Sequence, residues 1–399
     1  MTAPFQPDLR IAIVRFSALG DVVMVSAAVR ALQQCLPAAK ITWITSPLTY
    51  SLLKGMEGVQ FEVFEKPRSL ADYFAFYRAF RERRFDVVLA MQANLRINLL
   101  YPALRAPVKI GFDRIRSREG QWLFCNRRIP FADSHLVDSF LSFVETLTCK
   151  PASADWNLPV GSTDLEWAYE QLSTLSNGHC VSSAPDDIRP RNFTFPPTLL
   201  RQAQDRPSIP RRERENGASI HDDHDKYWVA IHPHSSKTER NWLPERYEEL
   251  VKQVVARWKC GVVLSGGSSA AELSLCERLA QLAPGHTINL CGKSTLKQLA
   301  ALLSLVDVLI APDTGSVHIA RAMNTPVIGL YAVASPKLSG PYRHLEYCVD
   351  RYPEAVNRYL GKDAGRLPWN TRVHDPRAMS LITVADVMSQ LDKVLRQRV

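Results

Sequence analysis

The sequence predicts an α/β protein made of two doubly wound domains that face each other across a cleft. In the first half, apolar runs at 10–15, 40–46, 59–65 and 85–92 alternate with helical segments. A second alternation starts at 226–233 and continues with apolar runs at 260–266, 287–292, 307–315 and 326–332. Strands that alternate with helices over short connections form parallel sheets that helices cover on both faces. The 399 residues are enough for two such domains, each with its own core.

The predicted domain boundaries follow changes in composition. The N-terminal domain covers 1–175 and ends after a helix at 163–175. Residues 176–225 are rich in Pro, Ser, Arg and Asp with little hydrophobic periodicity, so a largely disordered linker or insertion is predicted there. The C-terminal domain covers 226–380, and we expect the terminal helix at 381–399 to pack back on the N-terminal domain.

The composition excludes several classes of protein. A chain that is 46% hydrophobic and 22% charged is too apolar for a disordered protein and too polar for a membrane-embedded one. No run approaches the ~18 apolar residues of a spanning helix, and no secretory signal is expected at the N-terminus. The eight cysteines lie far apart, without C-x-x-C pairs or Cys/His clusters. These features predict a cytoplasmic protein with reduced thiols and no metal site.

Positive charge is concentrated in residues 78–128. Twelve basic residues there oppose four acidic ones, which accounts for +8 of a net charge of +9. Such a field attracts a polyanion, namely nucleic acid, an anionic membrane surface or a phosphorylated substrate, although a solvated face that only aids solubility has the same composition. No helix-turn-helix, zinc or aromatic RNA-binding signature accompanies the charge, so no nucleic-acid partner is expected. Arginine outnumbers lysine, which favours paired contacts to phosphate or carboxylate.

A turn after the first predicted strand carries a candidate catalytic residue. The segment 15–21 reads RFSALGD and places Asp21 at or near the start of a helix. Asp there caps a helix by accepting amide hydrogen bonds. The alternative is that Asp21 projects into the cleft as a general base, which the helix amides and dipole keep ionised.

Three loops of the second half follow strands and meet at one edge of the predicted sheet. Residues 311–318 combine a hydroxyl residue and a glycine at a helix start, where backbone amides bind a diphosphate. Residues 232–242 contribute hydroxyls with Lys and Arg, and residues 265–269 form a Gly/Ser loop with Glu272 close by to bind ribose hydroxyls. Each loop alone fits a capped or solvated turn, but their coincidence favours a nucleotide site.

The sequence resembles the heptosyltransferases of glycosyltransferase family 9. The resemblance rests on the segments RFSALGD, HPHSSKTERNW, LSGG and APDTGSVHIARAMNTPVIGLY. It implies the GT-B fold, in which an N-terminal Rossmann-like domain binds the acceptor and a C-terminal one binds the nucleotide sugar. It also implies inverting transfer of heptose from ADP-heptose to an inner-core sugar of lipopolysaccharide, a step in bacterial outer-membrane biogenesis.

Site residues follow from the resemblance and the loops together. Asp21 matches the catalytic base. The donor-binding candidates are Ser235, Ser236, Arg240, Gly266, Glu272, Asp313, Thr314, Gly315 and His318. The acceptor-binding candidates are Arg78, Arg81, Arg84 and Arg118. Arg at 240 replaces a usual Lys, Tyr331–Ala334 replaces a Gly-Pro-Thr-like turn, and 176–225 has no counterpart in compact members.

The predicted partners are a nucleotide sugar and an anionic glycolipid, with peripheral contact at the inner face of the inner membrane. No cofactor or metal is expected, because positioned donors stabilise a departing diphosphate by themselves. Two alternatives stay open at this point. The first alternative to a heptosyltransferase is a GT-B enzyme that uses another nucleotide sugar. The second is a catalytically silent scaffold with the same fold.

Overall fold

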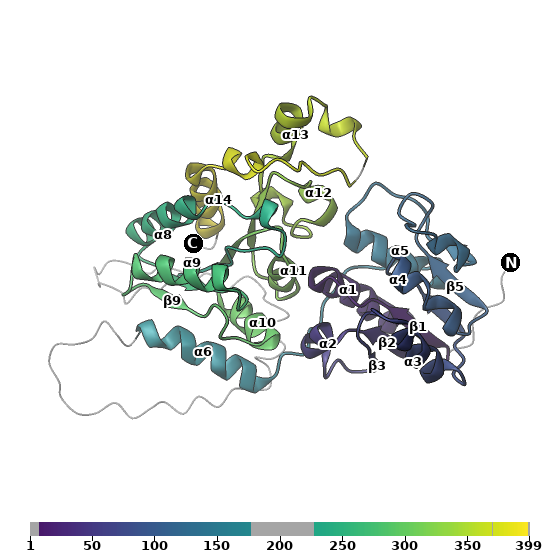
Figure 1. Cartoon of the computed structure of the whole chain (residues 1–399). Helices are drawn as coiled ribbons and strands as arrows, with labels where there is room; N and C mark the ends of the chain where they lie inside the picture. The colour runs from purple at the N-terminus through teal and green to yellow at the C-terminus, as the bar shows by residue number, and fades with distance from the viewer. Residues whose placement is uncertain (1–7, 177–226, 369, 398–399) are drawn as a thin grey trace, which may run out of the picture.

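The structure, a computed structural model, describes residues 8–176, 227–368 and 370–397. The predicted linker at 176–225 lies outside these residues except for its first residue, which ends helix α6. Two α/β domains lie side by side, and helices α1 and α11 stand where they meet (Figure 1). The predicted fold class is confirmed.

The N-terminal domain contains a six-stranded, all-parallel sheet in the order β3-β2-β1-β4-β5-β6. Its strands are β1 (Arg10–Val14), β2 (Lys40–Thr45), β3 (Val59–Val63), β4 (Val87–Leu89), β5 (Val108–Gly111) and β6 (Arg127–Arg128). Its helices are α1 (Leu19–Cys35), α2 (Pro47–Leu53), α3 (Leu70–Phe80), α4 (Leu95–Asn98) and α5 (Leu136–Thr148). The sequence analysis did not find β5, β6 or α5.

The C-terminal domain repeats this topology with the order β12-β11-β10-β7-β8-β9, again all parallel. Its strands are β7 (Trp228–Ile231), β8 (Gly261–Leu264), β9 (Thr287–Asn289), β10 (Val308–Pro312), β11 (Val327–Tyr331) and β12 (Val349–Asp350). Its helices are α8 (Pro244–Trp258), α9 (Ala270–Gln281), α10 (Leu296–Leu305), α11 (Gly315–Ala322), α12 (Pro336–Ser339), α13 (Tyr352–Leu360) and α14 (Val384–Arg396). In both domains the strand order therefore reverses beside the first strand, between β1 and β4 and between β7 and β10, which is where ligands bind in doubly wound sheets.

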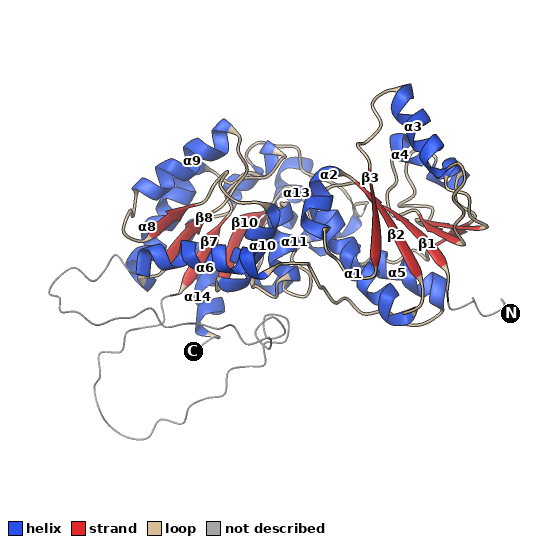
Figure 2. Ribbon diagram, turned by 90° about the horizontal axis from the view of Figure 1, so that it is seen from below, coloured by secondary structure: helices blue, strands red, loops and turns tan. Residues whose placement is uncertain are grey.

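Alternate residues of each strand enter cores on opposite faces of the sheet. In β1, Ile11 and Ile13 pack with α1 and α5, whereas Ala12 and Val14 pack with the aromatic side chains of α3. Figure 2 shows α3 and α4 on one face of this sheet and α1 and α5 on the other. This two-sided burial explains why the strands read as nearly continuous apolar runs.

One apolar core continues from the first domain into the second. Side chains of α1 and α5 share it with residues of α10 and α11. Polar contacts flank this interface, since the Tyr342 hydroxyl donates to Asp138 Oδ1 at 2.6 Å and His135 Nε2 lies 2.9 Å from the Gly340 carbonyl oxygen. The packing places the carboxyl ends of both sheets at a shared cleft.

Two segments belong to a different domain from the one the sequence analysis assigned. Helix α6 (Ser162–Ser176), which closed the predicted N-terminal domain, packs through Ala168 and Leu172 on the C-terminal core beside α10 and β9. Helix α14 packs with α8 in its own domain, so the expectation that it returns to the N-terminal domain is wrong. Its apolar stripe is buried in its own core, where the Trp242 indole also donates to the Ile382 carbonyl at 3.0 Å. Within the described ranges, no helix has the length and apolarity needed to cross a bilayer.

Candidate active site

A cleft of about 790 Å³ lies between the two domains and takes lining residues from both. Six basic side chains and two carboxylates line it; the basic ones are Arg15, Arg116, Arg118, Lys237, Arg240 and Arg372. The carboxylates are Asp21 from the N-terminal domain and Asp313 from the C-terminal domain. An excess of cationic groups suits an anionic ligand.

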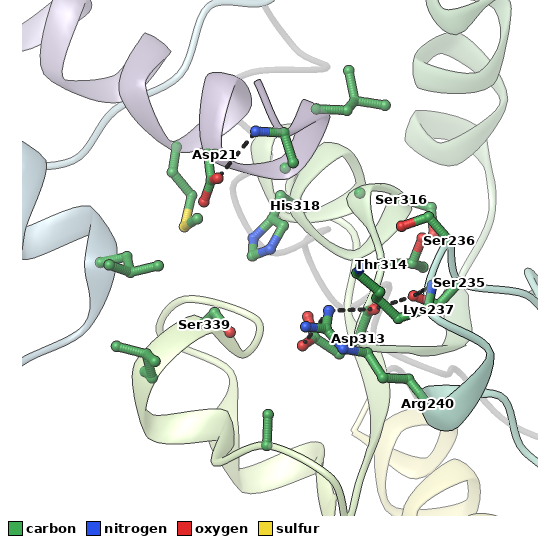
Figure 3. Close-up of a pocket in the computed structure, with 18 of the residues that line it drawn as sticks. Asp21, Ser235, Ser236, Lys237, Arg240, Asp313, Thr314, Ser316, His318 and Ser339 are labelled. Atoms are coloured by element: carbon green, nitrogen blue, oxygen red, sulfur yellow. Dashed lines mark hydrogen bonds and ion pairs between the residues drawn. The ribbon is translucent and has the colours of Figure 1, made fainter. Parts of the chain in front are cut away.

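Asp21 is the third residue of α1, directly after the switch point beside β1. Its Oδ2 accepts the Ala18 backbone N–H at 3.1 Å and also pairs with the Arg15 guanidinium. Both interactions use one oxygen, and about a quarter of the side chain, 26%, stays exposed. Asp21 therefore combines the two interpretations that the sequence left open, because it closes the helix start and also presents a carboxylate to the cleft (Figure 3).

Arg15 holds Asp21 in place and was missed by the sequence analysis. Its guanidinium also donates to the Met91 carbonyl at 2.5 Å and lies over the Phe140 ring at 5.4 Å. Only the fold reveals this role, because helix α5 and the segment after strand β4 provide the other two contacts. A guanidinium fixed on three sides keeps the carboxylate in one orientation.

The start of α1 packs directly on α11. A Cβ at Gly20 would overlap the His318 ring, so glycine is required for this approach. Burial, together with a smaller contribution from the nearby His135, lowers the pKa of His318 to about 4, so the imidazole is neutral near pH 7. His318 thus lines the cleft as an uncharged ring that connects the two domains (Figure 3).

The N-terminus of α11 opens into the same cleft. Thr314 is the N-cap residue, and its side chain makes no capping bond. The Ser316 hydroxyl is buried and has no hydrogen-bond partner among the described residues. Thr314, Gly315 and Ser316 all line the cleft, where the first amides of a helix bind anions.

Asp313 precedes this helix and organises the loop after β7. It is buried and pairs with Arg240, with 2.9 Å between Nη1 and Oδ2, while its backbone oxygen accepts the Ser235 hydroxyl at 2.8 Å. Burial raises the pKa of Asp313, and the charges of Arg240 and Arg372 oppose that rise. Asp313 therefore fixes the positions of Arg240 and Ser235 without meeting an anionic ligand itself.

Arg372 is a cleft residue that the sequence analysis missed. It comes from an irregular segment after α13, where the sequence has no clear periodicity. Burial, and then the neighbouring charge of Arg240, lowers its pKa, and Arg118 of the other domain contributes in the same direction. Arg118, Arg240 and Arg372 thus bring guanidinium groups from both domains to one region of the cleft.

The Gly/Ser loop after β8 fulfils its prediction only in part. Gly266 lines the cleft, but Glu272 does not. Glu272 accepts the Ser269 hydroxyl at 2.6 Å and the Gly267 amide at 3.0 Å, as the acidic member of a capping box on α9. Partial burial opposes its ionisation, but these hydrogen bonds prevail and lower its pKa. Its carboxylate is therefore engaged in closing the loop.

The predicted acceptor arginines separate into two groups. Arg118 lines the cleft, on a loop whose Glu119 carboxylate accepts the Leu95 amide at 2.5 Å. Arg78, Arg81 and Arg84 are exposed on α3 and the turn after it, and they do not line the cleft. The remaining predicted residues, Asp21, Ser235, Ser236, Arg240, Gly266, Asp313, Thr314, Gly315 and His318, all lie in the one cleft.

A family model of glycosyltransferase family 9 (heptosyltransferase) matches residues 73–360. The chain belongs to glycosyltransferase family 9. It is 31% identical over 384 residues to the lipopolysaccharide core heptosyltransferase OpsX of Haemophilus influenzae, with 96% of each chain covered. The resemblance found in the sequence, and the prediction of a glycosyltransferase, are confirmed.

Solved structures of this family share the fold. The ADP-heptose lps heptosyltransferase II of E. coli aligns with a TM-score of 0.65 at 18% identity, covering 98% of this chain and 99% of the other. The E. coli heptosyltransferase WaaC with ADP-2-deoxy-2-fluoro heptose aligns with a TM-score of 0.61 at 18% identity, covering 96% and 99%. The GT-B architecture that the resemblance implied is therefore confirmed.

Proposed function

We propose that this glycosyltransferase moves heptose, with inversion, from ADP-heptose to a sugar hydroxyl of the lipopolysaccharide inner core. The family and the OpsX relative support heptose and the core acceptor. One observation carries the mechanism. Asp21 and the N-terminus of α11 line the same cleft from opposite domains, so a base and an anion-binding site lie on either side of one ligand space.

Asp21 acts as the general base. The acceptor hydroxyl loses its proton to the carboxylate while its oxygen forms a bond to the anomeric carbon. The bond from that carbon to the diphosphate oxygen breaks on the opposite side, and ADP leaves with the bonding electrons. The interactions with Arg15 and Ala18 engage Oδ2, so Oδ1 receives the proton.

The C-terminal domain stabilises the negative charge that develops on the departing ADP. The amides at the start of α11 point into the cleft, and the Ser316 hydroxyl is available to donate. Arg240, held by Asp313, and Arg372 add positive charge. Charge stabilisation by fixed donors is usually the largest contribution to catalysis of this kind. The proposed mechanism therefore uses no metal ion or other cofactor.

The acceptor binds against the N-terminal domain, and the enzyme works in the cytoplasm at the inner face of the inner membrane. Arg118 is the predicted acceptor arginine that lies in the cleft, beside apolar residues of α5. It supplies a cation for the phosphates or carboxylates of a glycolipid.

Incubation with ADP-heptose and defined truncated core acceptors tests the proposal, with product mass as the readout. We expect one heptose to be added per acceptor. Parallel reactions with UDP- and GDP-sugars separate the alternative of another donor. If the protein binds ADP but transfers no sugar from any of these donors, the result would instead support the catalytically silent scaffold.

A further inference from the structure

Exposed apolar side chains gather on one part of the N-terminal domain. Of the fifteen large hydrophobic residues that are exposed in the described ranges, nine lie between residues 70 and 131. They are Leu70, Phe74, Tyr77, Leu95, Leu99, Ile115, Trp122, Leu123 and Phe131. A concentration of this kind marks an interaction surface, since single exposed apolar residues are otherwise scattered.

Helix α3 has two apolar faces. Phe76 and Phe80 are buried in the core below it. Leu70, Phe74 and Tyr77 follow at intervals of four and three residues and share a second, neighbouring face, where Leu70 is 76% and Phe74 74% exposed. A helix that covers a sheet needs only one apolar stripe, so the outer one is available to something else.

The outer face of α3 continues over α4 to the cleft. The Tyr77 hydroxyl donates to the Leu99 carbonyl at 2.9 Å, and the Tyr73 hydroxyl donates to the Arg96 carbonyl at 3.1 Å. Next, the Asn98 side chain donates to the Arg118 carbonyl at 3.1 Å. Because Arg118 lines the cleft, these contacts connect the outer face to the proposed acceptor side.

We define the α3–α4 surface as Leu70, Phe74, Tyr77, Leu95, Leu99, Trp122 and Leu123. Helices α3 and α4 lie on the face of the N-terminal sheet opposite α1 and α5 (Figure 2). Trp122 and Leu123 are 54% and 65% exposed and follow the Arg118–Gly120 loop after the buried Gln121.

The same stretch of chain carries the excess positive charge. Residues 78–128 hold twelve basic and four acidic residues, and Arg78, Arg81 and Arg96 are exposed on or beside α3 and α4. Two nearby carboxylates are engaged locally, while a third, Glu82, is exposed between Arg81 and Arg83. Asp72 accepts the Ser69 amide at 2.8 Å at the start of α3, and Glu119 accepts the Leu95 amide at 2.5 Å. An apolar surface bordered by arginines matches the interface of an anionic bilayer.

We propose that the α3–α4 surface docks on an anionic lipid bilayer, with the apolar side chains among the acyl chains and the arginines at the headgroups. This inference names the surface for the membrane contact in the proposed function. Docking through this surface places the Arg118 end of the cleft close to the membrane. The sugar of a glycolipid then enters the cleft while its acyl chains stay in the bilayer. Arg78 and Arg81 then act on lipid headgroups and not on the sugar in the cleft.

Flotation of the full chain with vesicles tests the proposal. The probes are vesicles of phosphatidylcholine alone and of phosphatidylcholine with phosphatidylglycerol, both free of glycolipid. We expect binding to the anionic vesicles only, weakened by salt. The double variant Leu70→Ser/Phe74→Ser is expected to lower the bound fraction ~10-fold or more. The matched control, Leu273→Ser/Leu360→Ser, removes exposed leucines of α9 and α13 and is expected to bind like the wild type.

Folding and catalysis are followed separately. Leu70 and Phe74 do not line the cleft, so transfer to a soluble deacylated acceptor is expected to stay unchanged in the double variant. The proposal fails if the wild type does not float with anionic vesicles, if the double variant floats equally well, or if the substitutions instead abolish a dimer seen without lipid. Vesicle binding without heptose transfer would reject the proposed donor but keep the docking surface. Transfer without vesicle binding would do the reverse.

Discussion

Two aspartates at strand-to-helix junctions of the two domains have different roles. Asp21 follows the first strand of the N-terminal sheet, and Asp313 follows the fourth strand of the C-terminal sheet. Each pairs with an arginine, Arg15 in one case and Arg240 in the other. Asp21 keeps 26% of its side chain exposed, whereas Asp313 keeps 11%.

The difference lies in what surrounds each carboxylate. Asp313 is a buried organiser, since its side chain fixes Arg240 and its backbone oxygen fixes Ser235. Asp21 is held through one oxygen and borders the cleft. A carboxylate that lines the cleft is therefore not identified as the base by its position alone. The hydrogen bonds and ion pairs of its two oxygens distinguish the base from the organising residue.

The largest expected effect is on turnover, which should distinguish Asp21 from Asp313. Asp21→Asn removes the proton acceptor and is expected to lower kcat by ~10²- to 10⁴-fold. Binding of ADP, measured by calorimetry, is expected to stay within about twofold, because Asp21 faces the acceptor. An unchanged kcat would refute the assignment of the base.

Asp313→Asn tests the structural role of the second aspartate through the stability of the protein. It leaves the largely covered Arg240 without a counter-charge, so we expect the free energy of unfolding to fall by about 3 kcal/mol. Chemical denaturation of both variants provides the comparison. Asp21→Asn, at a more exposed site, is expected to lose less, and a larger loss for Asp21→Asn would reverse the assigned roles.

His318 makes the contact between the domains sensitive to acid. Its folded pKa of about 4 lies below the ordinary value of 6.5, so the folded state binds this proton more weakly than the unfolded state. Stability from this group is therefore complete above about pH 6.5 and is lost as the pH falls toward 4, by roughly 3 kcal/mol in total.

Denaturation curves of wild type and His318→Gln across this range measure the contribution. We expect a shallower pH dependence in the variant. Some dependence remains, because burial also lowers the pKa of His232 and His344 to about 4. Identical slopes would show that His318 is protonated without cost in the folded protein.

Arg372→Gln gives the smallest expected change. Loss of one guanidinium beside the diphosphate site is expected to raise the dissociation constant of ADP about tenfold. We expect kcat to fall less than in Asp21→Asn, because the other donors to the departing diphosphate remain. The control Lys252→Gln removes an exposed cation of α8 and is expected to leave ADP binding unaltered. Equal affinity in both variants would exclude Arg372 from the donor site.

The sequence predicted those parts of the architecture that depend on short stretches of neighbouring residues. Apolar runs marked the longer strands, and residues just after them, such as Asp21 and Thr314, had to meet at the sheet edges. Helix α5 was missed although its apolar residues recur at helical spacing, whereas strand β6 gave no local sign. Strand β6 has only two residues, both arginine, and its pairing with β5 comes from the fold.

The missed site residues depend on contacts over long distances in sequence. Arg15 acquires its role from Met91 and Phe140, and Arg372 reaches the cleft from a segment without periodicity. Conversely, Arg78, Arg81 and Arg84 were assigned to the acceptor because net charge locates a residue along the chain, not on a face of the sheet. They lie on helix α3 and in the segment directly after it, away from the cleft.

The close approach at Gly20 has a consequence for inhibitors. A compound that joins an acceptor mimic to a diphosphate mimic must bridge α1 and α11 across this point. A substitution that blocks such a compound by adding a side chain at Gly20 would also push against His318 and separate the base from the donor. Drug resistance by that route would therefore disable the enzyme it protects.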